Sequence, residues 1–257
     1  MFSHGNAEDI YLVQTWLQSY FLKHVEVNAV VYEYTGFGES NGRIPAETSL
    51  YDDIETVYLY LTENLNISPD NIILYGRSIG SGPSSYLAEK YDVAGVILHS
   101  PLMSALRVLF NLRWTLPFDK FPNIDRMPNI DCPVFIIHGR RDEIVPFYHA
   151  RELHQATQHK YPPYYVDGAG HNNVEKFASD YLQRIKQFIS HVDRFVIERS
   201  LREEREAARF DSEEEAKIQR HSSNDRSSDA LHGPNIHVDT PLLVDNAQPK
   251  LSATKPN

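Results

Sequence analysis

Short runs of β-branched and aromatic residues alternate with amphipathic stretches along residues 1–199, and this alternation limits the fold more than any other feature of the chain. Five runs are predicted to be strands: NAVVYEY at 28–34, NIILY at 71–75, VAGVIL at 93–98, PVFIIH at 133–138 and YYV at 164–166. Apolar residues spaced by three or four predict helices over 10–21, capped by Asp9, and over 50–61 and 174–188. Strands that are apolar throughout and alternate with helices are typical of a mainly parallel sheet covered on both faces, so we predict an α/β fold.

The composition of the chain changes at Ser200. Of the 257 residues, 41% are apolar, which is enough for one large core. The segment SLREEREAARFDSEEEAKIQRHSS that starts at Ser200 has almost no aliphatic side chains, and a mixture of Ser, Asp, Asn and Pro follows it up to Asn257. Too little apolar surface is available there to offset a chain entropy of about 1–2 kcal/mol per ordered residue. We therefore predict one domain over 1–199 and a charged helix with a disordered tail over 200–257; a solvated tail is the simpler interpretation, and a partner-binding arm is the alternative.

Charge, cysteine content and hydropathy argue against several classes of protein. A formal net charge of −10 argues against nucleic-acid binding, which needs clustered Lys and Arg. No apolar run reaches the roughly 18–20 residues of a membrane-spanning helix, and the amino terminus has no signal-peptide pattern. The single cysteine, Cys132, cannot form an internal disulfide and is expected to be a buried apolar residue beside Pro133. Together these features predict a cytoplasmic protein in a reducing compartment.

The candidate chemistry begins at Gly76-Arg77-Ser78-Ile79-Gly80, which follows the predicted strand NIILY directly and opens a helix-like stretch. A G-x-S-x-G sequence between a strand and a helix is typical of a nucleophile elbow. The flanking glycines permit a sharp, strained turn, because a Cβ atom at either position would collide with the strand or the helix. We therefore predict that Ser78 is a nucleophile whose Oγ stands above the carboxyl end of the sheet. A glycine-bounded turn with a capping serine is the structural alternative.

A serine hydroxyl needs a base that takes its proton and an acid that orients the base. Because open α/β sheets gather their functional groups at the carboxyl ends of the strands, the candidates lie in the loops after PVFIIH and YYV. Asp142 in the first loop and His171 in the second give the chain order Ser, Asp, His that is found in α/β-hydrolases. Glu143 and Asp167 are the rival acids. Hydrogen-bonded packing is expected for the two histidines that end strands nearby, His99 and His138.

Acyl transfer also needs N–H donors for the oxyanion that develops on the substrate carbonyl. The backbone N–H of Ile79, the residue after the nucleophile, is the first candidate. The second donor is expected in the loop Ser3-His4-Gly5-Asn6, which makes a tight turn before the first helix, and the backbone N–H of Asn6 is the candidate there. The tripeptide His-Gly-Asn is weak evidence by itself; its place before a helix and the other parts of the site support it.

These residues and their surroundings resemble the α/β-hydrolase domain-containing protein 17 family, serine thioesterases that remove palmitate from cysteines of membrane-associated proteins. The matching strings follow the family's order over residues 2–192: SHGNAED from Ser3, YEYTGFGES from Tyr32, SPDNIILYGRSIGSGP from Ser68, VILHSPLMSALRV from Val96, VFIIHGRRDEIV from Val134, and VDGAGHNNVE followed by LQRIKQFISH. HSPLMS is much more specific to the family than the elbow, which indicates only a fold. The resemblance implies Ser78 as the acyl-accepting nucleophile, Asp142 and His171 as its partners, and no metal or organic cofactor.

The segment between Pro101 and Asp131 is short, so the resemblance implies a small cap in place of a large lid. It holds a set of large apolar side chains: Leu102, Met103, Leu106, Leu109, Phe110, Leu112 and Trp114. Two interpretations are open for them. In the first, they form one wall of a groove for a long acyl chain, and burial of each CH₂ group of that chain contributes about 0.8 kcal/mol to binding. In the second, they pack onto the sheet.

The chain departs from the family in three ways. Position 77 is Arg where the family is expected to have Gln, and the charged tail is extra. The family also has a lipid-modified, Cys-rich segment and two or three strands ahead of the His-Gly-Asn turn, whereas this sequence starts at Met1-Phe2-Ser3. One of those strands is central, so we expect an α/β-hydrolase fold that lacks its first two to three strands and leaves NAVVYEY and NIILY with unpaired backbone. Such a fragment is expected to be poorly soluble or inactive by itself.

The sequence therefore predicts a serine hydrolase that cleaves long-chain acyl thioesters on proteins, S-palmitoyl-cysteine, through a Ser-His-Asp triad and an acyl-enzyme intermediate. The alternatives are a lipase, esterase or serine peptidase of the same fold, or a catalytically inactive scaffold. The expected partner is an S-acylated, membrane-associated protein, with no nucleic acid, and the protein is expected to be a monomer. Any peripheral membrane contact is expected to come from a segment upstream of Met1.

Overall fold

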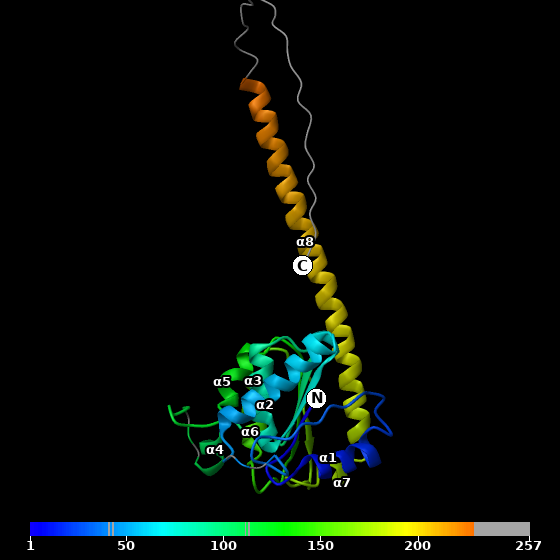
Figure 1. Cartoon of the computed structure of the whole chain (residues 1–257), viewed down its shortest axis with the longest axis vertical. Coiled ribbons are helices and arrows are strands. Elements are labelled where there is room, and N and C mark those ends of the chain that lie inside the picture. The colour runs from blue at the N-terminus through cyan, green and yellow to red at the C-terminus, as the bar shows by residue number, and fades with distance from the viewer. Residues whose placement is uncertain (41, 43, 111, 113, 229–257) are drawn as a thin grey trace, which may run out of the picture. The chain divides into compact units, whose positions relative to one another are not determined.

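The computed structural model describes residues 1–40, 42, 44–110, 112 and 114–228, and the chain divides into two units, Met1–Arg202 and Glu203–Asn257. Within the described residues, the first unit contains a five-stranded, all-parallel sheet (Figure 1). In spatial order its strands are β1 (Phe2–Ser3), β2 (Ile73–Arg77), β3 (Gly95–His99), β4 (Val134–Gly139) and β5 (Tyr164–Val166). The mainly parallel sheet that the sequence predicts is confirmed.

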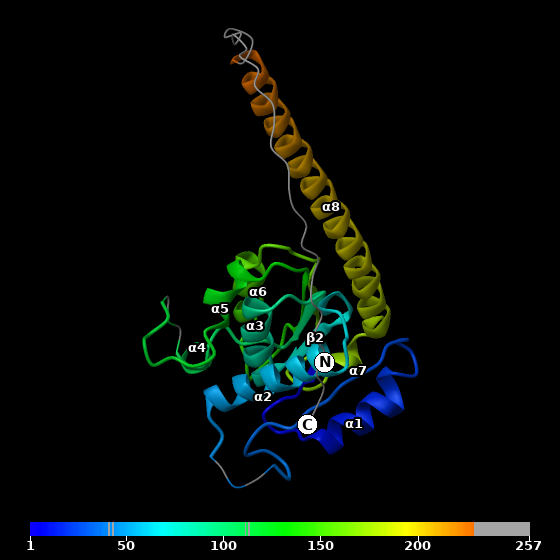
Figure 2. The same cartoon turned by 45° about the horizontal axis from the view of Figure 1, so that its top comes forward.

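Helices lie on both faces of this sheet (Figures 1 and 2). They are α1 (Ile10–Trp16), α2 (Glu47–Leu59), α3 (Ser81–Lys90), α4 (Ala105–Leu109), α5 (Asn123–Arg126), α6 (Tyr148–Ala156), α7 (Val174–Phe177) and α8 (Tyr181–Ser228). Helices α2, α3 and α6 cover one face, and α1 and the beginning of α8 cover the other. The predicted cover on both faces is therefore confirmed.

Alternate side chains of each strand enter two separate buried clusters. The face toward α2 and α3 receives one set of strand residues: Leu74, Val96, Leu98, Val134 and Ile136. The face toward α1 and α8 receives the other: Tyr75, Ile97, Phe135 and Ile137. Because both faces are covered, the strands read as continuous apolar runs in the sequence.

The predicted strand over 28–34 is wrong as a regular strand. Only Val31 pairs with the sheet, through a single parallel bridge to Phe2, and the Phe2 N–H donates to the Val30 carbonyl at 2.8 Å. The reason is the length of its neighbour: β1 has two residues, so it offers too few backbone groups for a longer ladder. Where the sequence predicts that a central strand is missing, the two-residue β1 lies between the 28–34 segment and β2 and pairs Phe2 with Tyr75.

The other predicted elements, except the helix over 174–188, are confirmed, most of them with shifted ends. Strands β2, β3 and β4 each end one or two residues later than predicted, and β5 has the predicted bounds. Asp9 caps α1, since its side chain accepts the Leu12 N–H at 2.8 Å. The single helix predicted over 174–188 is wrong, because the chain leaves helical geometry at Ala178 and starts again as α8 at Tyr181.

The second unit is described from Glu203 to Ser228, where it is the carboxyl part of α8. The side chains of residues 203–214 are all exposed, including Phe210. In the part of the chain that the structure describes, no helix is both long enough and apolar enough to cross a bilayer. The disordered tail predicted after this helix, from residue 229 on, lies outside the described residues.

Candidate active site

The turn that carries Ser78 is strained and closely packed. It follows β2 directly, and Ser78 has a φ of +52°, a conformation that costs a non-glycine residue about 1–3 kcal/mol. A Cβ atom on Gly76 would lie 2.6 Å from the Gly80 carbonyl oxygen, and one on Gly80 would lie 2.1 Å from the Ser3 carbonyl oxygen. Both positions of the motif therefore require glycine, and the Ser3–His4 backbone packs against the elbow.

A chain of hydrogen bonds joins Ser78 to His171 and Asp142. His171 Nε2 lies 2.9 Å from Ser78 Oγ, and His171 Nδ1 lies 2.7 Å from Asp142 Oδ2. A carboxylate oxygen can only accept, so Nδ1 carries the ring proton and Nε2 accepts the Ser78 hydroxyl proton. The parallel sheet explains the meeting of three distant residues, because each follows the carboxyl end of a strand: β2, β4 and β5.

Asp142 is held as a buried carboxylate. Its Oδ1 accepts the backbone N–H groups of Ile144 at 2.9 Å and Val145 at 2.8 Å, while Oδ2 faces His171. Burial raises the pKa of Asp142, but the hydrogen bond and charge of His171, together with the Val145 N–H and the charge of His138, outweigh it and lower the pKa on balance. The ionised form, which orients the imidazole, is therefore the favoured one.

The rival acids point elsewhere. The Asp167 side chain is 92% exposed and pairs with Arg140 at 3.0 Å. Glu143 is exposed and lies against Gly170, where an added Cβ would meet its Oε2 at 2.7 Å. The hydrogen bond of Asp142 to His171 separates it from both rivals.

The two other histidines near the site are buried and packed, as the sequence predicts. His99 Nδ1 bonds the Tyr75 hydroxyl at 2.8 Å, and His138 Nε2 bonds the Val145 carbonyl at 3.0 Å. Burial first, and then neighbouring charges, lowers the pKa of His99 well below its usual value, and burial also lowers the pKa of His138. Each ring has one buried nitrogen without a hydrogen-bond partner among the described residues.

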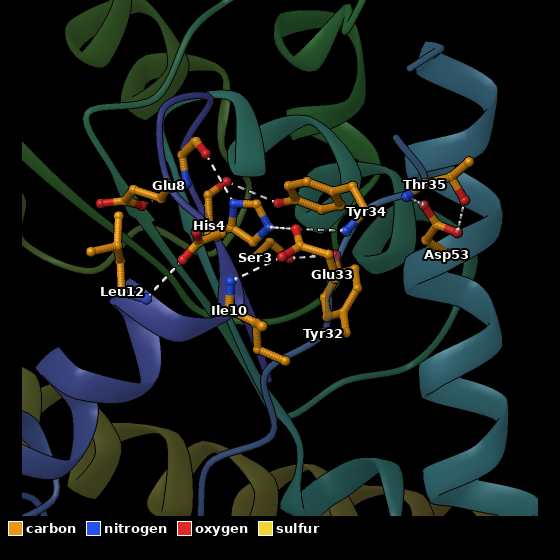
Figure 3. Close-up of polar contacts among 12 residues, drawn as sticks. Ser3, His4, Glu8, Ile10, Leu12, Tyr32, Glu33, Tyr34, Thr35 and Asp53 are labelled. Atoms are coloured by element: carbon orange, nitrogen blue, oxygen red, sulfur yellow. Dashed lines mark hydrogen bonds and ion pairs between the residues drawn. The ribbon is translucent and has the colours of Figure 1, made fainter. Parts of the chain in front are cut away.

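The loop after β1 is fixed by a polar network that sequence reasoning missed (Figure 3). The buried His4 bonds Glu33 through Nε2 at 2.8 Å, and its carbonyl accepts the Tyr34 hydroxyl at 2.9 Å. The Ser3 hydroxyl bonds that of Tyr32 at 2.8 Å. One feature of the sequence could have indicated this network. Glu33 lies between two tyrosines in a run that otherwise suits a buried strand, and a buried carboxylate needs a partner.

The two candidate oxyanion donors come from adjoining segments. Ile79 is half-buried in the elbow, and Asn6 is exposed in the loop whose residues Ser3 and His4 pack against Gly80. The structure thus brings the two segments together. The roles of the Ile79 and Asn6 N–H groups stay a prediction.

The cap segment is small and divides its apolar residues between two environments. Leu102 and Met103 are buried on the sheet, whereas Leu109, Phe110 and Trp114 are exposed. The packing interpretation is thus confirmed for Leu102 and Met103, and the groove for an acyl chain stays a prediction. Cys132 is buried, and burial raises the pKa of its thiol to about 12, as expected of a small apolar residue.

An apolar cavity lies at the sheet, away from the candidate site. It has a volume of about 450 Å³ and is lined by the start of β2 and by β1, including Met1, Phe2 and Ile73. Ser78 follows the opposite, carboxyl end of β2. Among the described residues, no group of three or more His, Cys, Asp or Glu side chains is arranged to hold a metal ion.

The chain is similar in sequence to two kinds of curated protein. It is 44% identical over 195 residues to alpha/beta hydrolase domain-containing protein 17C of Mus musculus and 45% identical over 194 residues to protein 17B of Homo sapiens. Each alignment covers 74% of this chain, and 59% and 65% of the two relatives, so the chain spans about three fifths of their length. No protein-family model matches the chain.

Two solved structures resemble it in fold. An esterase of Pyrococcus furiosus superposes with a TM-score of 0.58 at 19% identity, over 74% of this chain and 81% of that one. A monoacylglycerol lipase of Paleococcus ferrophilus superposes with a TM-score of 0.56 at 16% identity, over 74% of this chain and 93% of that one. The parallel sheet, the strained serine turn and these superpositions identify an α/β-hydrolase fold. Over its aligned part, the sequence of the chain is similar to members of the α/β-hydrolase domain-containing protein 17 family.

Proposed function

We propose that the chain is a serine hydrolase that forms an acyl-enzyme at Ser78. The observation that carries the proposal is the hydrogen-bond chain from Ser78 Oγ through His171 to Asp142, with distances of 2.9 and 2.7 Å. It joins a nucleophile, a base in the accepting tautomer and an orienting carboxylate. The strained elbow supports the same role, because strain of this kind is kept where a side chain must be presented in one geometry.

Each residue has a defined task in the proposed reaction. His171 Nε2 takes the Ser78 hydroxyl proton while Oγ attacks the acyl carbon, and the carbonyl oxygen gains negative charge that the Ile79 and Asn6 N–H groups would bind. The bond to the leaving group then breaks, His171 gives the proton that it took to the departing group, and an ester remains on Ser78. In the second half, His171 takes a proton from water, the hydroxide attacks the ester, and Ser78 recovers its proton as the acid leaves.

The proposed substrate is a long-chain acyl thioester on a protein cysteine. A thiolate departs without full protonation, so this triad handles thioesters more readily than amides, whose nitrogen must receive a proton from His171. The exposed apolar residues Leu109, Phe110 and Trp114 of the cap segment support an apolar acyl chain as ligand. The partner would then be an S-acylated protein at a membrane, reached from the cytoplasm by a monomeric enzyme.

The test compares turnover of three substrates by the parent chain and by Ser78→Ala: a palmitoyl-cysteine peptide, a monoacylglycerol and a peptide amide. We expect kcat/KM to be highest for the thioester and all turnover to vanish in Ser78→Ala. A higher kcat/KM for the acylglycerol would indicate a lipase, and a higher kcat/KM for the amide would indicate a peptidase. Turnover that survives in Ser78→Ala, or a folded chain that hydrolyses none of the three, would refute the serine hydrolase and favour a scaffold.

A further inference from the structure

We infer that Arg77 is a positioning residue that, through Glu8, fixes the loop bearing the second oxyanion donor. Arg77 Nη1 lies 2.9 Å from Glu8 Oε1, and the other oxygen of that carboxylate, Oε2, accepts the Gly5 N–H at 2.7 Å. One carboxylate thus links the residue before the nucleophile to the residue before Asn6. The inference rests on the proposed function, because the loop matters to catalysis only if Ser78 is acylated.

The loop has little freedom while the carboxylate of Glu8 stays in place. The Glu8 N–H donates back to the Gly5 carbonyl at 3.2 Å, so the turn is closed by one backbone bond and one side-chain bond. A Cβ atom at Gly5 would lie 3.1 Å from Glu8 Oε2, which shows how closely the carboxylate covers the peptide. The Gly5–Asn6 peptide, which carries the Asn6 N–H, is therefore oriented by Glu8.

The Arg77–Glu8 pair is shielded enough to hold this geometry. The Arg77 side chain is 14% exposed and that of Glu8 23%, so solvent screens the pair less than a surface salt bridge. Burial lowers the pKa of Arg77, but the charges of Glu8 and then Glu175 raise it on balance, so the guanidinium stays charged. A charge-assisted hydrogen bond at 2.9 Å between such groups is stronger than a neutral one.

A second carboxylate places Arg77 between the two loops of the site. Glu175 Oε1 lies 3.9 Å from Arg77 Nη1, and Glu175 belongs to α7, shortly after His171 in the chain. The guanidinium therefore touches the loop after β1 on one side and approaches the segment after the base on the other. The contact with Glu8 is the shorter of the two, so we expect Glu8 to hold the guanidinium more strongly than Glu175 does.

Loss of the Arg77–Glu8 pair should lower kcat and leave KM nearly unchanged, because an oxyanion donor acts on charge that develops only in the transition state. Complete removal of one donor costs about 10² to 10³ in rate. Here the donor remains and only its position is loosened, so we expect Arg77→Gln and Glu8→Gln each to lower kcat by about tenfold. Arg77→Lys keeps a charge within reach of Glu8 and is expected to recover kcat to within about threefold of the parent.

The experiment measures kcat and KM on the palmitoyl-cysteine peptide, and amide hydrogen exchange in the peptide covering residues 4–9, for the parent, the three single variants and Arg77→Gln/Glu8→Gln. The matched control is Arg126→Gln, which breaks a similarly buried pair: Arg126 bonds Glu89 at 3.2 Å and stacks on Tyr51. The control should change neither kcat nor exchange at 4–9. Since the two residues act as one unit, the double variant should lose no more kcat than the worse single one.

Three results would each overturn the inference: kcat of Arg77→Gln within twofold of the parent, losses that multiply in the double variant, or unchanged exchange at 4–9. If Arg77→Gln does not fold, Arg77→Lys and Glu8→Gln decide on the same readouts. A parent chain that hydrolyses nothing would refute the proposed function instead. Exchange at 4–9 would still show whether Arg77 and Glu8 hold the loop.

Discussion

Replacing Asp142 by Asn tests how His171 is made ready to accept the proton of Ser78. An Asn side chain can place its oxygen where Oδ1 accepts the Ile144 and Val145 N–H groups, and its NH₂ then faces His171 Nδ1. A donor at that position favours the tautomer in which Nδ1 accepts and Nε2 carries the proton. Nε2 can then no longer take the Ser78 proton.

A wrong tautomer in a triad of this kind costs about 10⁴ in kcat, or roughly 5 kcal/mol of transition-state stabilisation. The assay is steady-state hydrolysis of an acyl thioester, with the folded fraction checked by circular dichroism. Asp167→Asn is the matched control, because the Asp167 carboxylate is 92% exposed and pairs with Arg140 instead of His171. A kcat of Asp142→Asn within tenfold of the parent, or a larger loss in Asp167→Asn, would refute the reasoning.

Three further predictions concern stability. Gly80→Ala should lower the free energy of unfolding in urea by about 3 kcal/mol or more, since its Cβ would lie 2.1 Å from the Ser3 carbonyl oxygen; equal stability would contradict the close approach. Glu33→Gln should cost about 1–3 kcal/mol, because it removes the charged acceptor that faces the buried His4, and an unchanged melting temperature would contradict that role. The pKa of Asp142 is lowered in the folded state, so the stability that its carboxylate contributes is complete above the unfolded pKa of about 3.9 and is lost as the pH falls through the lower, folded value. Between pH 5 and 2, the free energy of unfolding should therefore fall less steeply with decreasing pH in Asp142→Asn than in the parent. Identical slopes would contradict the lowered pKa.

The arrangement around Ser78 follows from local sequence rules combined with one rule of topology. A serine between two glycines after an apolar run predicts the elbow, and the parallel sheet predicts that loops after other strands meet it. That reasoning leads to the loops that hold Asp142 and His171, but Glu143 and Asp167 remained rival acids, and the hydrogen bond of Asp142 to His171 decides between them. The apolar runs also predict β3 and β4 well, because strands covered on both faces leave little ambiguity in the pattern.

What the sequence could not predict depends on contacts between distant segments. The 28–34 run has the composition of a strand, but a strand needs a partner of matching length, and β1 supplies two residues. The pairing of His4 with Glu33, and of Arg77 with Glu8, is likewise decided by which loops the fold brings together. Charged residues of this kind resemble any solvated surface residue until their partner is known.

The central claim is that folding makes Ser78 a nucleophile. Its most direct test is to treat the folded chain with a fluorophosphonate and to find the modified residue by mass spectrometry of the digested protein. We expect the adduct on the peptide that contains Ser78, with labelling abolished by prior unfolding and reduced by Asp142→Asn. An adduct on another serine, or no adduct on a chain shown to be folded, would contradict the claim.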